Sequence, residues 1–217
     1  MWHIEVARGR ADEFHQRALP APVEPTVWWF DVSVPALILG SSQPMDQVDL
    51  DVCARRGVDV VRRRSGGGAV LLLPGDATWV DVVIPPTHPA WTDDVGQSAW
   101  WLGEVWADAL AALGVNGGAV HRGAMVRTAW SGHVCFAGVG GGEVMRNGRK
   151  VVGISQRRSR NAARFQCALY HRWDAAAHAE LFRRPGPSVD DLTGLTDEVT
   201  AAVDDVRAAF AAALATA

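Results

Sequence analysis

Residues 60–76, VVRRRSGGGAVLLLPGD, place three consecutive arginines and three consecutive glycines between two apolar runs. Runs of valine and leucine bounded by turn residues are typical of strands, so this stretch predicts two strands joined by an arginine–glycine loop. Successive side chains of a strand point to opposite faces, so we expect Arg63 to point away from Arg62 and Arg64. The glycines allow backbone N–H groups to approach an anion, but the same pattern is also typical of a hairpin turn with solvated charges.

Segments on both sides of this loop predict a mixed α+β fold. The amphipathic spacing of apolar residues predicts a helix at 102–113, and Gly114 follows it as a stop signal. Further predicted helices lie at 11–18 and 45–57, and predicted strands lie at 26–32, 35–40, 58–62, 69–73, 79–85, 148–156 and 164–170. Because we find no repeat and no linker, we expect one domain over residues 1–217, with a helical C-terminal segment at about 174–217.

Composition limits the classes of function. The chain has 48% hydrophobic and 21% charged residues, as globular proteins do, and most of its ten tryptophans are expected to pack in the core. The formal net charge of -3 argues against a general nucleic-acid surface. The N-terminal residues lack the apolar region of a signal peptide, and no apolar segment is long enough to cross a bilayer. These features predict a cytoplasmic protein without membrane contacts.

The cysteines are three in number and far apart, at positions 53, 135 and 167. That arrangement fits neither a disulfide framework nor a four-ligand zinc site, so we expect no metal site. Cys53 falls in an amphipathic helix and is expected to pack. Cys135 falls in a glycine-rich segment, HVCFAGVGGGEV, where it could be a small hydrophobic residue or, beside cationic groups, a nucleophile.

A lysine with two possible roles begins the predicted strand at 148–156. The stem of Lys150 could enter a pocket and bring its ammonium to a carbonyl or phosphate group, or Lys150 could be a strand-edge lysine that serves solubility. Four arginines follow, and we expect them to form a local basic surface that either docks an acidic partner or is simply solvated. They are Arg157, Arg158, Arg160 and Arg164.

Three segments in this order resemble the catalytic domain shared by lipoate–protein ligases, octanoyltransferases and, more distantly, biotin ligases. They read PALILGSSQ, RRRSGGGAV and GRKVVGISQRR, and the resemblance covers roughly residues 26–185. It places the family's paired arginines at Arg62 and Arg63, and its essential lysine at Lys150. It implies a mixed, largely antiparallel sheet flanked by helices, related to the cores of class II aminoacyl-tRNA synthetases and biotin ligases.

The resemblance also implies a reaction, in which an octanoyl or lipoyl group is attached to a lysine of a lipoyl carrier domain. Carriers of this kind are the E2 subunits of 2-oxoacid dehydrogenases and the H protein of the glycine cleavage system. In the cysteine-dependent branch of octanoyltransferases, which this chain resembles best, Cys135 would hold the acyl group as a thioester. Acyl carrier protein or an octanoylated lipoyl domain would donate that group, and no cofactor would be required.

The expected site follows from these motifs. The catalytic residues would be Cys135 and Lys150, and the residues around the acyl group would be Arg63, Ser65, Gly66, Gly67, Gly68 and Gly153. Two alternatives stay open. One is an ATP- and Mg²⁺-dependent lipoate–protein ligase with Lys150 on an acyl-adenylate, and the other is a non-catalytic member that binds lipoyl domains or nucleic acid through its arginines.

Several positions depart from the common family pattern. Leu72 stands where many ligases have a histidine, and Asp76 stands where they have an asparagine. Cys167 and Ala168 replace a frequent His-Gly pair. These departures favour the transferase over the ligase, and they leave open a different acyl group or a loss of activity.

Overall fold

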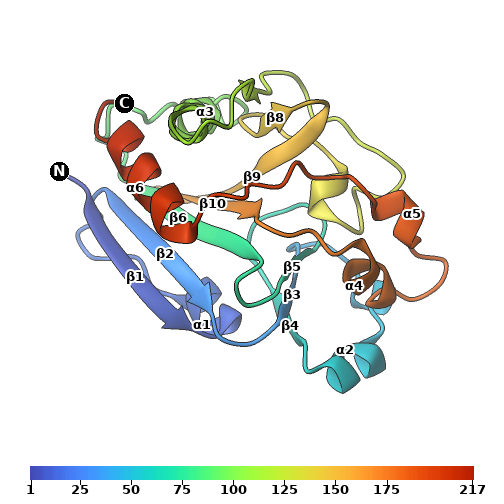
Figure 1. The fold of residues 1–217 in the computed structure, drawn as a ribbon. Helices are drawn as coiled ribbons and strands as arrows, with labels where there is room; N and C mark the ends of the chain where they lie inside the picture. Colours follow the sequence, from blue (N-terminus) through green and yellow to red (C-terminus); the bar gives the residue numbers. More distant parts are fainter.

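Two β-sheets share one hydrophobic core in the computed structural model, which describes residues 1–217 (Figure 1). The larger sheet has the order β1-β2-β6-β10-β9-β8-β7, and the smaller has the order β4-β3-β5. The strands are β1 (His3–Gly9), β2 (Thr26–Val32), β3 (Ala36–Leu39), β4 (Asp59–Arg62), β5 (Val70–Leu72), β6 (Ala77–Ile84), β7 (Ala119–Val120), β8 (Val144–Arg146), β9 (Arg149–Arg158) and β10 (Ala163–Tyr170). The β1–β2 and β3–β4 pairs are parallel, whereas the other pairs are antiparallel.

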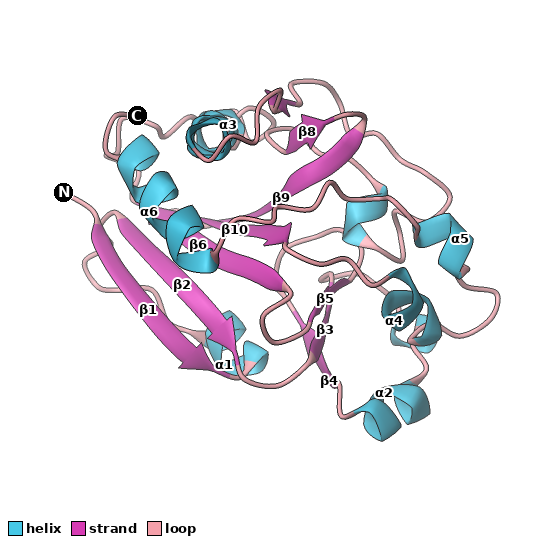
Figure 2. Ribbon diagram, in the orientation of Figure 1, coloured by secondary structure: helices cyan, strands magenta, loops and turns pink.

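Helices α3 (Trp100–Ala112) and α6 (Val203–Leu214) cover the face of the larger sheet opposite the smaller one (Figure 2). The other helices contribute buried residues to the core that the two sheets share; they are α1 (Ala11–Gln16), α2 (Leu50–Arg56), α4 (Ala175–Glu180) and α5 (Val189–Leu192). Two 3₁₀ turns are η1 (Met45–Gln47) and η2 (Cys135–Ala137). Side chains of β2 alternate between the two faces, so Trp29 packs against Phe210 of α6 while Trp28 faces the smaller sheet. The predicted fold class, a mixed and largely antiparallel sheet flanked by helices, is confirmed.

The predicted helix at 45–57 is two shorter elements. Val48 and Asp49 are extended between η1 and α2, and the Asp49 side chain accepts a hydrogen bond from the backbone N–H of Val52. This cap satisfies a free N–H group in the first turn of α2 and so fixes where the helix begins. At the other end Gly57 adopts the left-handed conformation, with φ of 64°, as expected for a helix stop.

Strand β1 was not predicted from the sequence. It pairs in parallel with β2 at the edge of the larger sheet, and it exposes Ile4 and Val6. An edge strand is hydrogen-bonded on one side only and needs no continuous apolar run. The sequence of β1 therefore lacks the apolar pattern by which a strand is predicted.

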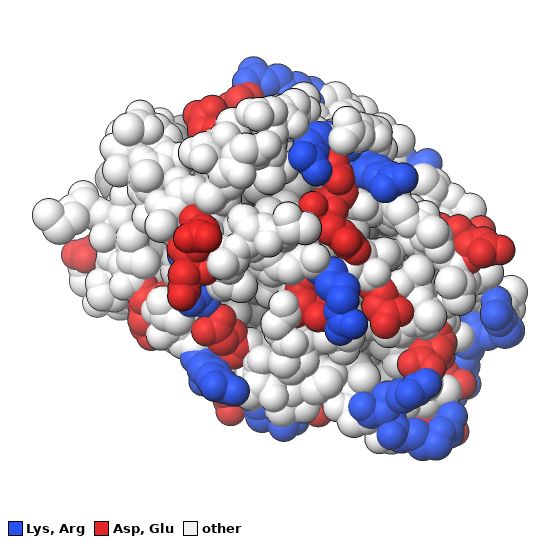
Figure 3. Space-filling model, in the orientation of Figure 1, with Lys and Arg blue, Asp and Glu red and all other residues white.

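The glycine-rich segment 117–142 contains only β7 and η2. An isolated bridge between Ala69 and Val134 attaches it to the rest of the chain, and a second bridge joins Val126 to Val139 within it. The first of these bridges places the cysteine segment against the arginine–glycine loop. Both signs of charge are scattered over the face seen in Figure 3, and the largest group of lysine and arginine atoms covers α2. None of the helices combines the length and the apolar content that a membrane span requires.

After Asp174 the chain forms α4, α5 and α6, which are joined by loops. His178 of α4 is buried, and its ring stacks on Trp173 with ring centroids 3.9 Å apart. Burial lowers the pKa of His178 from 6.5 to about 4, against the opposing effect of a hydrogen bond to the Asp174 carbonyl. The folded protein therefore holds this imidazole in its neutral form.

This burial predicts a loss of stability in mild acid. Between pH 6.5 and about 4 the unfolded chain binds a proton at His178 that the folded chain does not, so the free energy of unfolding falls as the pH falls, by up to about 3 kcal/mol. Urea denaturation across this range should show a smaller pH slope for His178→Phe than for the unsubstituted protein. Equal slopes would contradict the prediction, and His3→Phe, at an exposed position, is the control.

Candidate active site

Two backbone hydrogen bonds hold the cysteine segment against the arginine–glycine loop. Ala69 N–H donates to the His133 carbonyl at 2.7 Å, and Cys135 N–H donates to the Ala69 carbonyl at 2.8 Å. Gly68 must be glycine for this approach, because a Cβ there would lie 2.7 Å from the carbonyl carbon of Val134 and 2.8 Å from the Ser131 oxygen. The sequence suggested that the glycines admit a ligand. At Gly68 the structural reason is instead backbone packing.

Arg63 is the member of the arginine cluster that faces the cysteine. Its side chain is buried, whereas Arg62 and Arg64 are exposed, as strand alternation predicts. Arg63 Nη2 donates to the carbonyls of Gly66 at 2.7 Å and Gly68 at 3.0 Å, and it lies 3.8 Å from Cys135 Sγ. A guanidinium at this distance stabilises negative charge on the sulfur.

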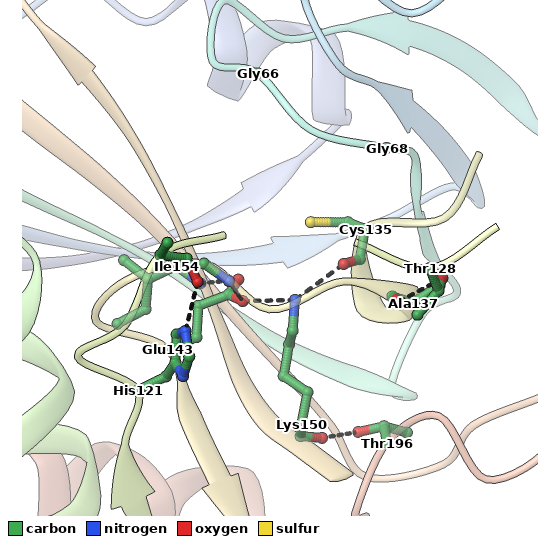
Figure 4. A network of polar contacts seen from close by, with 12 residues as sticks. Gly66, Gly68, His121, Thr128, Cys135, Ala137, Glu143, Lys150, Ile154 and Thr196 are labelled. Carbon is green, nitrogen blue, oxygen red and sulfur yellow. Dashed lines mark hydrogen bonds and ion pairs between the residues drawn. The ribbon is translucent and has the colours of Figure 1, made fainter. Parts of the chain in front are cut away.

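The ammonium group of Lys150 contacts the backbone carbonyl of Cys135 and not its sulfur. Its Nζ donates to the Cys135 carbonyl at 2.9 Å and pairs with Glu143 Oε2 at 2.7 Å (Figure 4). The two charged side chains are 2% and 4% exposed, so Lys150 is not a solvent-facing strand-edge lysine. Glu143 also accepts the N–H groups of Gly140 at 2.6 Å and Ile154 at 3.1 Å.

Two cavities meet at Cys135. The apolar pocket lies between the two sheets and is lined by His15, Ile38, Arg63, Val70, Leu72, Trp79, Cys135, Phe136, Gly153, Ile154, Ser155, Gln166, Cys167 and Ala168. The polar groove includes Gln43, Gly66, Gly67, Gly68, Arg127, Cys135, Glu143, Lys150, Ser155 and Gln156 in its lining. Cys135, Ile154 and Ser155 line both cavities.

The departures from the family pattern fall largely on the apolar pocket. Leu72, Cys167 and Ala168 all line it, and each presents a small or apolar surface. Asp76 does not line it, and instead binds Arg172 through two hydrogen bonds of 3.0 and 2.9 Å. The replaced residues therefore make this cavity more apolar.

The remaining expected site residues do not all lie at the same cavity. Gly66, Gly67 and Gly68 line the polar groove, and none of their N–H groups donates a hydrogen bond within the protein. Gly153 lines the apolar pocket, where a Cβ would meet the Phe136 ring at 3.2 Å. Ser65 lines neither cavity, and its hydroxyl instead bonds to Ser155 Oγ at 3.0 Å and Gln166 Oε1 at 3.1 Å.

The prediction that Arg164 contributes to a basic surface is wrong. Arg164 is buried, and it forms an ion pair with Asp81 at 2.5 Å and a hydrogen bond to the Phe14 carbonyl at 2.7 Å. It therefore contributes nothing to a surface. Arg158 packs over the Trp91 ring at 3.8 Å, so only Arg157 and Arg160 of the four are exposed.

Two site residues were missed from the sequence. Glu143 stands seven positions before Lys150, and a carboxylate inside a glycine-rich run is the one local sign of it. His15 lies far from the other motifs in sequence, and it reaches the apolar pocket because α1 packs beside Trp79, with ring centroids of His15 and Trp79 4.7 Å apart. No local pattern identifies His15.

The Lys150–Glu143 ion pair predicts that removing one charge lowers the free energy of unfolding more than removing both charges. Glu143→Leu leaves a buried ammonium without its counter-ion and should lower the free energy of unfolding by about 3–5 kcal/mol. The double variant Glu143→Leu with Lys150→Met removes both charges and should recover most of that loss. Urea denaturation measures both effects, and a double variant no more stable than Glu143→Leu would contradict the pairing.

The glycine loop predicts that alanine substitutions at Gly68 and Gly66 have different effects on the free energy of unfolding. Gly68→Ala should lower the free energy of unfolding by roughly 1–3 kcal/mol, because the new Cβ meets backbone that cannot move without shifting the cysteine segment. Gly66→Ala should have little effect, since nothing lies within 4 Å of a Cβ there. Equal stability of the two variants would mean that the loop relaxes freely.

Comparison with known proteins identifies the family of this chain. The family profile of the lipoyl protein ligase A/B catalytic domain matches residues 10–215. The chain is 31% identical over 137 residues to octanoyltransferase LipM of Moorella thermoacetica (strain ATCC 39073 / JCM 9320) and 27% identical over 136 residues to octanoyltransferase LipM of Clostridioides difficile (strain 630). Each match covers 62% of this chain and 49% of the relative, so the matched region is about half the length of these curated relatives.

A solved structure supports the fold independently. The crystal structure of lipoate-protein ligase A bound with ATP superposes with a TM-score of 0.74, over 99% of this chain and 83% of that one. The two sequences are 20% identical, so this similarity is evidence for the fold alone. With the profile matching nearly the whole chain, the protein belongs to the lipoyl protein ligase A/B catalytic domain family, which comprises acyltransferases and ligases of protein lipoylation.

Proposed function

We propose that this protein is an acyltransferase that places an octanoyl or lipoyl group on the lysine of a lipoyl carrier domain, through a thioester on Cys135. The observation that carries the proposal is the position of Cys135, which lies where the apolar pocket opens into the polar groove, with Arg63 beside its sulfur. An acyl chain on this sulfur could occupy the apolar pocket. Its carbonyl would then lie at the edge of the polar groove.

The reaction has two steps that balance without a cofactor. The Cys135 sulfur attacks the acyl carbonyl of the donor and forms a new C–S bond while the donor's own thioester C–S or amide C–N bond breaks. The proton of the Cys135 thiol passes to the leaving group, which departs as a thiol or an amine. The neutral amine of the carrier lysine then attacks the Cys135 thioester, the C–S bond breaks as an amide forms, and the amine proton returns to the cysteine. Each step passes through a tetrahedral oxyanion.

Groups that could stabilise this oxyanion line the polar groove. Gly66, Gly67 and Gly68 have free N–H groups there, and the Lys150 ammonium, which pairs with Glu143, donates one hydrogen bond, to the Cys135 carbonyl. Pre-positioned donors of this kind stabilise developing charge without a reorganisation cost. Lys150 would therefore act on the acyl carbonyl, with Glu143 fixing its position.

The partners follow from the family and from the chemistry. The acceptor would be a lipoyl domain of a 2-oxoacid dehydrogenase E2 subunit or the glycine cleavage H protein. The donor would be octanoyl acyl carrier protein or an octanoylated lipoyl domain. The two relatives that are octanoyltransferases support this choice over free lipoate as the donor.

Intact-mass spectrometry tests the covalent step. Incubation with octanoyl acyl carrier protein, or with an octanoylated lipoyl domain, should add one octanoyl group to the protein. Cys135→Ala should remove the adduct, because the other two cysteines are buried. Cys53→Ala, at a packing position, is the control and should keep the adduct. An adduct that persists in Cys135→Ala would rule out this nucleophile.

A second candidate is an ATP-dependent lipoate–protein ligase. It is favoured by the polar groove, where three free backbone N–H groups, Lys150 and Arg127 could hold phosphate. No group of three or more His, Cys, Asp or Glu side chains forms a metal site, so Mg²⁺ would be held largely through the phosphates of the nucleotide. This reaction would form AMP only when lipoate, ATP and Mg²⁺ are present, and Cys135→Ser would leave it unchanged.

A further inference from the structure

Two exposed arginines beside the polar groove have no counter-ion. Arg62 donates hydrogen bonds to three backbone carbonyls of its own chain, and Arg158 forms an ion pair with Asp93 at 3.5 Å. Arg64 and Arg157 are equally open to solvent, but neither side chain forms an ion pair or a hydrogen bond within the protein. These two residues, named here the arginine pair, are therefore available to an anion from outside.

A side-chain contact brings the two arginines together. Ser65, which follows Arg64, bonds through its hydroxyl to Ser155 Oγ at 3.0 Å. Strand alternation places the side chain of Arg157 on the same face of β9 as Ser155. Burial, together with the like charges of Arg64 and Arg164, lowers the pKa of Arg157. Two neighbouring cations repel each other, and an anion bound between them removes that repulsion.

The arginine pair lies next to the reacting sulfur and the groove. The residue before each member belongs to the site, since Arg63 Nη2 lies 3.8 Å from Cys135 Sγ and Gln156 lines the polar groove. Beyond the first arginine, a Cβ at Gly67 would lie 3.6 Å from the same sulfur. A protein whose lysine enters the groove toward Cys135 would therefore bring the neighbours of that lysine to the arginine pair.

From this arrangement we propose that the arginine pair is a recognition site for a carboxylate side chain next to the target lysine of the carrier domain. This inference rests on the proposed function, since it takes the carrier lysine to attack an acyl group on Cys135. Guanidinium groups bind carboxylates through short, charge-assisted hydrogen bonds, often two at a time. The chain as a whole has a net charge of -3, so this positive charge is local and would orient the carrier at the groove.

The phosphate of a phosphopantetheine arm is the other anion that arginines of this kind could bind. It lies at the far end of a long, flexible chain from the thioester that reacts. The residues beside the target lysine are instead one side-chain length from the reacting amine. The closeness of the arginine pair to Cys135 therefore favours the carboxylate.

Transfer from a preformed thioester tests this recognition. The protein is loaded with octanoyl pantetheine, which carries no phosphate, and is then mixed with a lipoyl domain that has an acidic residue next to its target lysine. The double variant Arg64→Glu with Arg157→Glu should load at an unchanged rate. Its half-saturating concentration of lipoyl domain should rise about tenfold at low salt. Added salt should bring the unsubstituted protein toward the value of the variant.

Charge changes on both partners separate recognition from folding. A lipoyl domain in which the acidic neighbours of the lysine are replaced by their amides should bind the unsubstituted protein more weakly, by a similar factor. Lysines at the same positions should restore transfer by the double variant. Arg8→Glu is the matched control, because it reverses another exposed arginine, on β1, which three strands separate from β9, and it should change nothing.

Two results would overturn the proposal. One is an unchanged half-saturating concentration of lipoyl domain in the double variant. The other is a defect of that variant confined to loading from octanoyl phosphopantetheine, which would assign the arginine pair to phosphate. Failure of octanoyl pantetheine to load the unsubstituted protein would instead contradict the Cys135 transferase, and it would be seen before any lipoyl domain is added.

Discussion

The buried ion pair between Lys150 and Glu143 is the contact on which the site depends. The backbone of Lys150 binds the C-terminal segment, since its carbonyl accepts from Thr196 Oγ1 at 2.8 Å and from Asp197 N–H at 3.0 Å. Its side chain binds the Cys135 carbonyl, and its counter-ion Glu143 binds the backbone at Gly140 and Ile154 (Figure 4). One residue thus joins β9, the cysteine segment, the glycine-rich loop and the C-terminal segment.

Such a pair does little for stability as a whole. Removing two charges from water costs about as much as their attraction returns, so a buried pair is better explained by what it positions than by what it stabilises. Here it holds the ammonium against the backbone of the cysteine and not against the sulfur, and Arg63 takes the position beside the sulfur. In the proposed reaction the two cations would therefore have separate tasks, one toward the acyl carbonyl and one toward the nucleophile.

Much of the fold could be predicted from local sequence, because its central strands consist of continuous runs of apolar and aromatic residues. Residues 26–32 are both the predicted strand and the observed β2. Strand alternation predicted that Arg63 points away from Arg62 and Arg64, and the structure shows that its side is the buried one. Contacts made at long range could not be predicted in this way. Glu143 is recognisable as a site residue only once Lys150 lies against it, and His15 only once α1 packs beside β6. The glycine at position 68 indicated a close approach to the backbone there. The residue that approaches is Val134, which lies 66 positions further along the chain and could not be identified from local sequence.

Burial also decides which of the three thiols can react. Cys53 packs in the core, and Cys167 lies at the wall of the apolar pocket, where complete burial strongly raises the pKa of its thiol and holds it protonated. Cys135 alone is partly exposed, and it alone has a guanidinium beside its sulfur. Cys167 replaces a polar residue of the common family pattern, and its protonated thiol adds an uncharged, weakly polar surface to the pocket. The pocket wall is thus apolar apart from Arg63, Ser155, Gln166 and His15. In the proposed acyl site these few polar groups, and not the apolar bulk of the wall, would distinguish one acyl chain from another.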